Sequence, residues 1–207
     1  MRQNMFNGYV WILLAALLWS LLGVVSKFCQ HAGVLPLETA FWRAAIGCAF
    51  FLTHAALTGG LRIPLRHALT FMLFGAWGVG VFFGAMQMAI KLSGGATAVV
   101  LLYTAPVWVA VFSRFLFGEH ITRRKALAVL IALSGTALVC FSGGSLPGET
   151  SLEGIGFGLL SGLCYATHYP FYRWWQSRYS TASIYGFMLL GGVAALGISG
   201  PVHVDHA

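Results

Sequence analysis

The 207-residue sequence has few charged residues, since Asp, Glu, Lys and Arg together make up 8% of the chain and only five residues are acidic. A soluble globular domain has about 25% charged residues, so this composition excludes that class. Apolar residues make up 58% of the chain, and the mean hydropathy is +0.81. We therefore expect an integral membrane protein surrounded by lipid.

The sequence also lacks a basic domain, although its net charge is +7. The cations lie in short clusters between apolar runs, and no polar segment carries a basic face of the kind that binds nucleic acid. We interpret these charges as determinants of membrane topology and expect no nucleic-acid partner.

Cysteine is scarce and scattered. None of the four residues, Cys29, Cys48, Cys140 and Cys164, has the spacing of a metal site or of a disulfide framework. We expect free thiols that pack as small apolar groups, with no metal and no cofactor.

Long apolar runs are what the chain has instead. A bilayer core needs roughly 20 apolar residues per helix, and seven runs meet this length, which indicates an all-α polytopic membrane protein. The first run is too long for a signal peptide and is expected to be a retained span. The expected spans are residues 9–29, 37–57, 68–90, 95–117, 124–142, 152–173 and 181–199.

Helix boundaries are marked by residues that favour caps. Pro36 and Glu38 belong in a first helical turn, and the segment 150–153 has the spacing of a capping box. Gly118 fits the left-handed position after a helix, and Thr122 can cap the next one.

The charges in the connections alternate between two sides, with Lys91 as the one cation on the acidic side. The positive-inside rule then places the N-terminus in the cytoplasm of a bacterial-type inner membrane. The cationic side has Arg2, Arg62, Arg66, Arg123, Arg124, Lys125, Arg173 and Arg178, and the other side has Glu38, Glu149, Glu153 and Asp205.

Glu119 is the one acidic residue on the predicted cytoplasmic side. We expect it to form an ion-pair cluster that joins the ends of the fourth and fifth spans, with substrate contact as the alternative. The surrounding cations are Arg114, Arg123, Arg124 and Lys125.

A weak internal repeat appears when the chain is shifted by 146 residues. Five spans separate the copies, so the second copy enters the membrane from the opposite side, as in many secondary transporters. The second copy stops after two spans, so we expect a truncated repeat. The shift aligns Gly8 with Gly154, Trp19 with Tyr165, and Lys27 with Arg173.

The sequence contains a set of specific motifs, namely Pro36-Leu37-Glu38, Phe41-Trp42-Arg43, and the segment 85–139 with Tyr103-Thr104-Ala105-Pro106, Gly118-Glu119 and Thr122-Arg123-Arg124-Lys125. These motifs resemble the EamA domain of the drug/metabolite transporter superfamily, which implies a ten-helix inverted-repeat carrier for amino acids, other metabolites, nucleotide sugars or drugs. Under this resemblance residues 9–142 form one five-helix repeat and residues 150–207 a truncated second repeat.

Several polar residues within the spans are candidates for a substrate path. Pro106 breaks the fourth run near its centre, and Tyr103 and Thr104 flank the break, where Thr104 could instead satisfy freed backbone. Arg43 lies about 7 Å from the centre of its helix, and a buried arginine at such a depth usually faces a cavity or a partner.

Four further candidates lie within the spans, and two of them have a structural alternative. Trp19 and Lys27 share one face of the first span, but Lys27 could extend to the membrane interface. Gln87 is as well explained by a hydrogen bond between helices. His168, next to Pro170, could bind a proton.

The expected function is alternating-access transport of small metabolites such as amino acids, with export as one direction, and Arg43 and Lys27 favour substrates with an anionic group. The expected partners are lipid, a small-molecule substrate and a homodimer. The alternatives are a non-transporting fragment and a dimerising half-carrier. An intramembrane serine protease at Ser199 and a metal site at His203, Asp205 and His206 are disfavoured, because these residues end the last span or lie in the tail.

Overall fold

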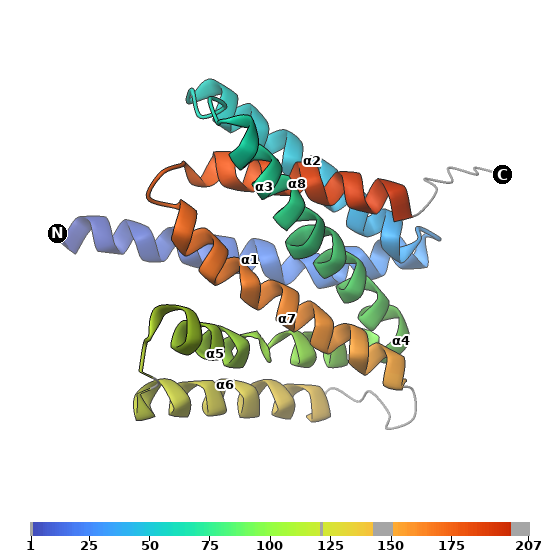
Figure 1. Cartoon of the computed structure of the whole chain (residues 1–207). Helices are drawn as coiled ribbons and strands as arrows, with labels where there is room; N and C mark the ends of the chain where they lie inside the picture. The colour runs from blue at the N-terminus through green and yellow to red at the C-terminus, as the bar shows by residue number, and fades with distance from the viewer. Residues whose placement is uncertain (1, 121, 143–150, 200–207) are drawn as a thin grey trace. The chain divides into compact units, whose positions relative to one another are not determined.

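The computed structural model describes residues 2–120, 122–142 and 151–199, and these residues form helices joined by short connections (Figure 1). No strand occurs within these ranges. The elements are α1 (Arg2–His31), α2 (Pro36–Leu57), α3 (Leu65–Gly75), the π-helix η1 (Ala76–Val81), α4 (Phe82–Leu102), α5 (Ala105–Phe117), α6 (Arg123–Ser142), α7 (Leu152–Trp175) and α8 (Thr181–Ser199).

The chain divides into two compact units, residues 1–35 and 36–207. The first unit is a single 30-residue helix, α1, which includes the first expected span. The second unit contains the other helices and the candidate site. By length and hydropathy, three described stretches could cross a membrane, namely Pro36–Leu57, Leu65–Phe117 and Thr181–Ile198.

The 53-residue stretch Leu65–Phe117 corresponds to the third and fourth expected spans. The connection expected between spans 68–90 and 95–117 includes Gly94, whose φ of 76° interrupts the helical backbone of α4. A second break falls at Tyr103 and Thr104, between α4 and α5. The third span is also irregular, because six residues of it form the π-helix η1.

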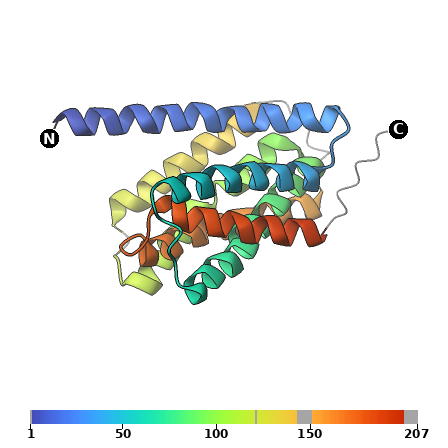
Figure 2. The same cartoon turned by 90° about the horizontal axis from the view of Figure 1, so that it is seen from above.

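Helices α2 and α8 pack side by side and run in opposite directions, as both views show (Figures 1 and 2). The Cys48 thiol donates to the Gly186 carbonyl at 3.6 Å, and a Cβ added at Gly197 would contact the Phe41 ring at 3.5 Å. Residues near the start of α2 therefore contact the end of α8, and residues further along α2 contact the start of α8, so the two helices are antiparallel. The core between these helices and α3 includes the fully buried residues Ala40, Ala44, Phe71 and Ile184.

Small residues let α7 approach α4 closely. Gly154, Gly158 and Gly162 repeat every four residues along one face of α7, and added Cβ atoms there would meet Ser93, Leu101 and Thr104 respectively. Such small-xxx-small faces allow close helix packing in membranes. Ser151 caps α7 by accepting a hydrogen bond from the Gly154 N–H at 3.0 Å, which places the observed cap within the expected 150–153 segment.

Contacts between connections divide the second unit into two ends. At one end, the Ser183 hydroxyl donates to the Gly60 carbonyl at 2.7 Å, and His67 Nδ1 lies 2.6 Å from the Tyr179 hydroxyl. At the other end, the Ser151 N–H donates to the Leu92 carbonyl at 3.4 Å. Each contact joins two segments that the charge pattern assigns to the same side.

The close approach of α3 and α8 predicts that Gly191→Ala is destabilising. A Cβ at Gly191 would overlap the Met72 backbone, and overpacking of this kind costs about 1–3 kcal/mol. The measurement is the unfolding midpoint of the purified protein in detergent.

Gly156→Ala is the matched control, because a Cβ there would meet nothing within 4 Å. Alanine favours a helix over glycine by roughly 0.5–1 kcal/mol, so the control should be neutral or stabilising. Equal midpoints for the two variants would contradict the packing of α3 against α8.

Candidate functional site

The break between α4 and α5 exposes polar backbone within the fourth expected span. Pro106 occupies the first turn of α5, and because proline has no N–H, it cannot bond to the Leu102 carbonyl four residues earlier. The Thr104 hydroxyl donates to the Leu101 carbonyl at 2.7 Å, and the Thr104 N–H donates to the same oxygen at 3.1 Å. Thr104 thus bonds the Leu101 carbonyl at the break, one residue before the Leu102 carbonyl that the proline leaves without its helical donor.

Helix α7 lies directly against this break. A Cβ added at Gly162 would lie 2.7 Å from Thr104 Oγ1, 3.0 Å from the Leu101 carbonyl oxygen and 3.3 Å from the Leu102 carbonyl oxygen. Only glycine leaves room for the polar atoms of the break to face α7. The helix interruption is therefore part of an interface between segments far apart in the sequence.

A second polar backbone group is released in the π-helix η1. The Phe82 N–H donates to the Trp77 and Val79 carbonyls and so passes over the Gly78 carbonyl, its acceptor in a regular α-helix. His168 Nε2 lies 2.6 Å from that Gly78 oxygen. Since a carbonyl only accepts, Nε2 carries the proton and donates.

Aromatic rings surround the His168 imidazole on several sides. Tyr165, one turn earlier in α7, lies 5.9 Å away between ring centroids, and Tyr185 of α8 lies 6.4 Å away. The Phe74 and Phe82 rings lie at 5.6 Å and 6.2 Å. We call these residues, with His168, the His168 cluster.

Arg43 contacts the edge of this region through one more ring. Its guanidinium carbon lies 4.2 Å from the centroid of the Phe83 ring, and Phe83 lies 5.2 Å from Phe82. Among the described residues, Phe83 is the recorded partner of the Arg43 guanidinium. A cation held by a ring face keeps its hydrogen-bond donors available for a ligand.

The remaining candidates are placed differently. Gln87 of α4 is fully buried, with 1% of its surface exposed, whereas the Tyr103 side chain at the break is half exposed. The side chains of Trp19, Lys27 and Lys125 lie outside the described residues.

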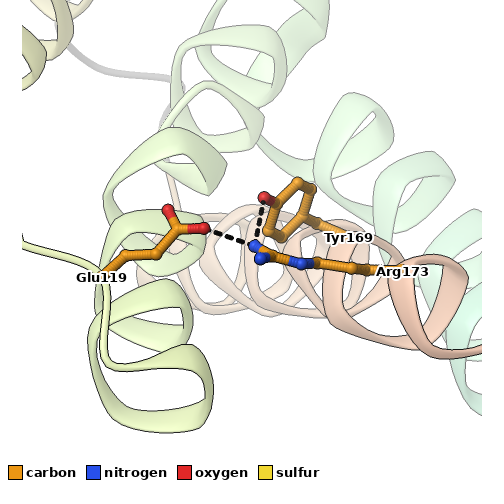
Figure 3. A network of polar contacts seen from close by, with 3 residues as sticks. All are labelled: Glu119, Tyr169 and Arg173. Carbon is orange, nitrogen blue, oxygen red and sulfur yellow. Dashed lines mark hydrogen bonds and ion pairs between the residues drawn. The ribbon is translucent and has the colours of Figure 1, made fainter.

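Glu119 forms an ion pair with Arg173, which also donates a hydrogen bond to the Tyr169 hydroxyl at 3.1 Å (Figure 3). The Arg173 guanidinium carbon lies 4.1 Å from the Phe117 ring centroid. Gly118 confirms its expected left-handed conformation with φ 65° and turns the chain so that Glu119 reaches α7. This network joins the end of α5 to the last turn of α7.

The partner of Glu119 was not indicated by its neighbours in the sequence. Arg114, Arg123 and Arg124 are exposed, and the structure records no ion pair for these three residues. Thr122 precedes α6, and its carbonyl accepts from the Ala126 N–H at 3.0 Å, as expected of a capping residue. Glu119 therefore connects α5 to α7 in addition to any contact near α6.

The structure adds little evidence on the two disfavoured alternatives, the serine protease at Ser199 and the metal site in the tail. Ser199 is the final residue of α8, and His203, Asp205 and His206 lie outside the described residues. Within the described ranges, no group of three or more His, Cys, Asp or Glu side chains is arranged to hold a metal ion.

Sequence reasoning missed Gly78, Tyr165 and Tyr185 as parts of the site. Tyr165 and His168 are three residues apart and so share one face of α7, a signal that was present in the sequence. The role of Gly78 depends on the local π-helix, which leaves no clear sequence pattern.

The model of the EamA-like transporter family matches residues 6–141 of this chain. The chain belongs to the EamA-like transporter family. Because it belongs to this family and has helices long and apolar enough to cross a membrane, it is an integral membrane protein. The chain is similar to the uncharacterized transporter YdfC of Bacillus subtilis, with 28% identity over 77% of this chain and 52% of the relative. An uncharacterized transporter of Archaeoglobus fulgidus is 31% identical over 85% of this chain and 61% of that protein.

The EamA chain thus spans between half and two thirds of the length of these relatives. A crystal structure of another protein is similar in fold, with a TM-score of 0.69 at 22% identity, over 92% of this chain and 65% of that one. The similarity to this structure supports the helical arrangement described above.

The Glu119–Arg173 pair predicts non-additive effects on stability. The variants Glu119→Gln and Arg173→Gln should each lower the unfolding midpoint slightly, and the double variant should lose less than the sum of the two, because the second change removes a partner already lost. The measurement is a double-mutant cycle in detergent.

The matched control is a cycle between Glu119→Gln and Arg123→Gln, because the structure records no ion pair for Arg123. This control cycle should be additive. Coupling in the control cycle but not in the Arg173 cycle would contradict the observed pairing.

Proposed function

We propose that this EamA-family chain belongs to a secondary transporter that moves small metabolites, such as amino acids or related compounds, by alternating access, with export as its direction. The observation that carries the proposal is the break between α4 and α5. Its polar groups lie against Gly162 of α7, and discontinuous helices at the interface of two repeats frame the binding sites of many transporters.

The packing of α2 against α8 supports an inverted repeat. Shifted back by 146 residues, α7 (152–175) falls on residues 6–29, within α1, and α8 (181–199) falls on residues 35–53, close to α2. Equivalent helices related by a two-fold axis in the membrane plane run antiparallel where they meet, as α2 and α8 do. We interpret the five expected spans within α1–α6 as one repeat, in which α3, η1 and the first part of α4 form the third span. Helices α7 and α8 are then the start of a second repeat.

The proposed orientation places the N-terminus in the cytoplasm of a bacterial inner membrane. The positive-inside rule supplies the direction, and the contacts Glu119–Arg173 and Gly60–Ser183 join segments assigned to the cytoplasmic side. The opposite end, with Leu92 and Ser151 in contact, then faces outwards. Association of the chain with itself and with particular lipids remains a prediction of the sequence.

Arg43 is the group that we propose for recognition of an anionic substrate moiety. Arg43 of α2 lies over the Phe83 ring. Phe83 neighbours Phe82, which belongs to the His168 cluster. A guanidinium binds a carboxylate or phosphate in bidentate fashion. Substrates with an anionic group are therefore favoured.

The test is Arg43→Ala in the full-length protein expressed in bacterial cells, with extracellular metabolites quantified by mass spectrometry. We expect metabolites that accumulate outside wild-type cells to lose that accumulation by about tenfold or more, because one charge-assisted contact contributes about 1.5–3 kcal/mol. Membrane-inserted protein is quantified in parallel.

The neighbouring variant Trp42→Ala is the matched control. Trp42 is half exposed and contacts Phe41 rather than Phe83, so its removal should leave export near the wild-type level. Wild-type export by well-expressed Arg43→Ala would remove Arg43 from the pathway, and a complete absence of export by the wild type would contradict the transport function.

A further inference from the structure

We propose that Nδ1 of His168 is a proton-binding site that couples proton movement to transport. The inference rests on the proposed function and adds its coupling ion, the proton. His168 is partly buried in α7, and its ring lies between the His168 cluster rings described above. Histidine is the side chain whose ordinary pKa, about 6.5, lies nearest neutral pH.

The hydrogen bond to η1 determines which nitrogen titrates. Nε2 donates to the Gly78 carbonyl, so the neutral ring has its lone pair on Nδ1. The structure records no hydrogen bond at Nδ1 with a described residue. A proton from water on one side adds to Nδ1 to form imidazolium, and release to the other side restores the neutral ring. No redox partner is required.

The site can stabilise the added charge. The Gly78 carbonyl would then accept a charge-assisted hydrogen bond, which is stronger than a neutral one. The Tyr165 ring, stacked on the imidazole at 5.9 Å between ring centroids, contributes attraction between a cation and an aromatic face. A Cβ at Gly78 would lie 2.9 Å from Nε2, so the glycine is needed for the imidazole to reach η1.

The groups that face His168 leave it as the one that titrates near neutral pH. Phe74 of α3, Gly78 of η1 and Phe82 of α4 carry no ionisable side chain. Tyr165 of α7 and Tyr185 of α8 do, but their ordinary pKa is about 10. Among charged side chains, Arg43 lies over Phe83, the ring next to Phe82, and Arg173 of α7 pairs with Glu119.

Protonation of His168 would affect both repeats, because its hydrogen bond joins a helix of one repeat to a helix of the other. His168 belongs to α7, whereas Gly78 lies in the third expected span. In a regular α-helix the Phe82 N–H would take the Gly78 carbonyl that His168 now occupies. Exchange of this acceptor between Phe82 and His168 would convert η1 to α-helix, and π-helical turns often mark such functional positions. The hydrogen bond thus links proton binding to helix geometry.

The first experiment is a pH titration of ¹⁵N-histidine-labelled protein in lipid nanodiscs by NMR. The spectrum of His168→Gln assigns the His168 signals. We expect Nδ1 to titrate between pH 5 and 8 while Nε2 keeps its proton throughout. A His168 ring that stays in one protonation state from pH 4.5 to 8.5 would overturn the proposal.

The second experiment measures the labelling rate of Tyr103→Cys, placed at the helix break, by a soluble maleimide, with rates corrected for thiol ionisation by a free-cysteine standard. The corrected rate should change with pH, by at most about tenfold per pH unit for a one-proton equilibrium. The change should be lost in His168→Gln. The control His54→Gln, at an exposed histidine of α2, should keep it.

The outcomes of these experiments separate this proposal from the proposed function. If His168→Gln keeps the pH dependence of labelling, the coupling through His168 is wrong even when Arg43→Ala still abolishes export. If wild-type export is absent but His168 titrates and controls the labelling rate, the carrier assignment fails while the proton site stands. If His168→Gln does not fold, the wild-type titration still decides whether Nδ1 binds a proton.

Discussion

In a membrane, every backbone N–H and C=O that leaves a regular helix must find a partner within the protein, because lipid offers none. Besides the interruption at Gly94 in α4, the described part of this chain departs from regular α-helix at η1 and at the break between α4 and α5. At η1 the released Gly78 carbonyl is taken by His168, and at the break Thr104 bonds the Leu101 carbonyl. These partners determine where polar chemistry can lie within the apolar bundle.

Helix α7 brings these irregular positions together. Its glycine face approaches the break, its His168 reaches η1, and its last turn places Arg173 beside Glu119. A movement of α7 against the preceding helices would change all three contacts at once. This is the arrangement expected if the first helix of a second repeat moves against the first repeat during transport.

Much of the fold follows from local chemistry that the sequence displays. The breaker residues Gly94 and Pro106 and the left-handed Gly118 lie where the helices are interrupted, because glycine and proline act on their own backbone. The partners of side chains were harder to predict. Glu119 was expected among neighbouring cations, and its additional pair with Arg173, 54 residues away, was not predicted. The π-helix that exposes Gly78 has no clear sequence pattern. Long-range packing decides such contacts.

The proposed inverted repeat predicts that α7 enters the membrane from the side opposite to α1. It is tested most directly by single cysteines at Arg62, Glu153 and Arg178 in a background without native cysteines, labelled with an impermeant maleimide in intact cells and in inverted membrane vesicles. The inverted arrangement predicts labelling of Glu153→Cys from outside, and of Arg62→Cys and Arg178→Cys from the cytoplasmic face. Labelling of Glu153→Cys and Arg62→Cys from the same face would contradict it.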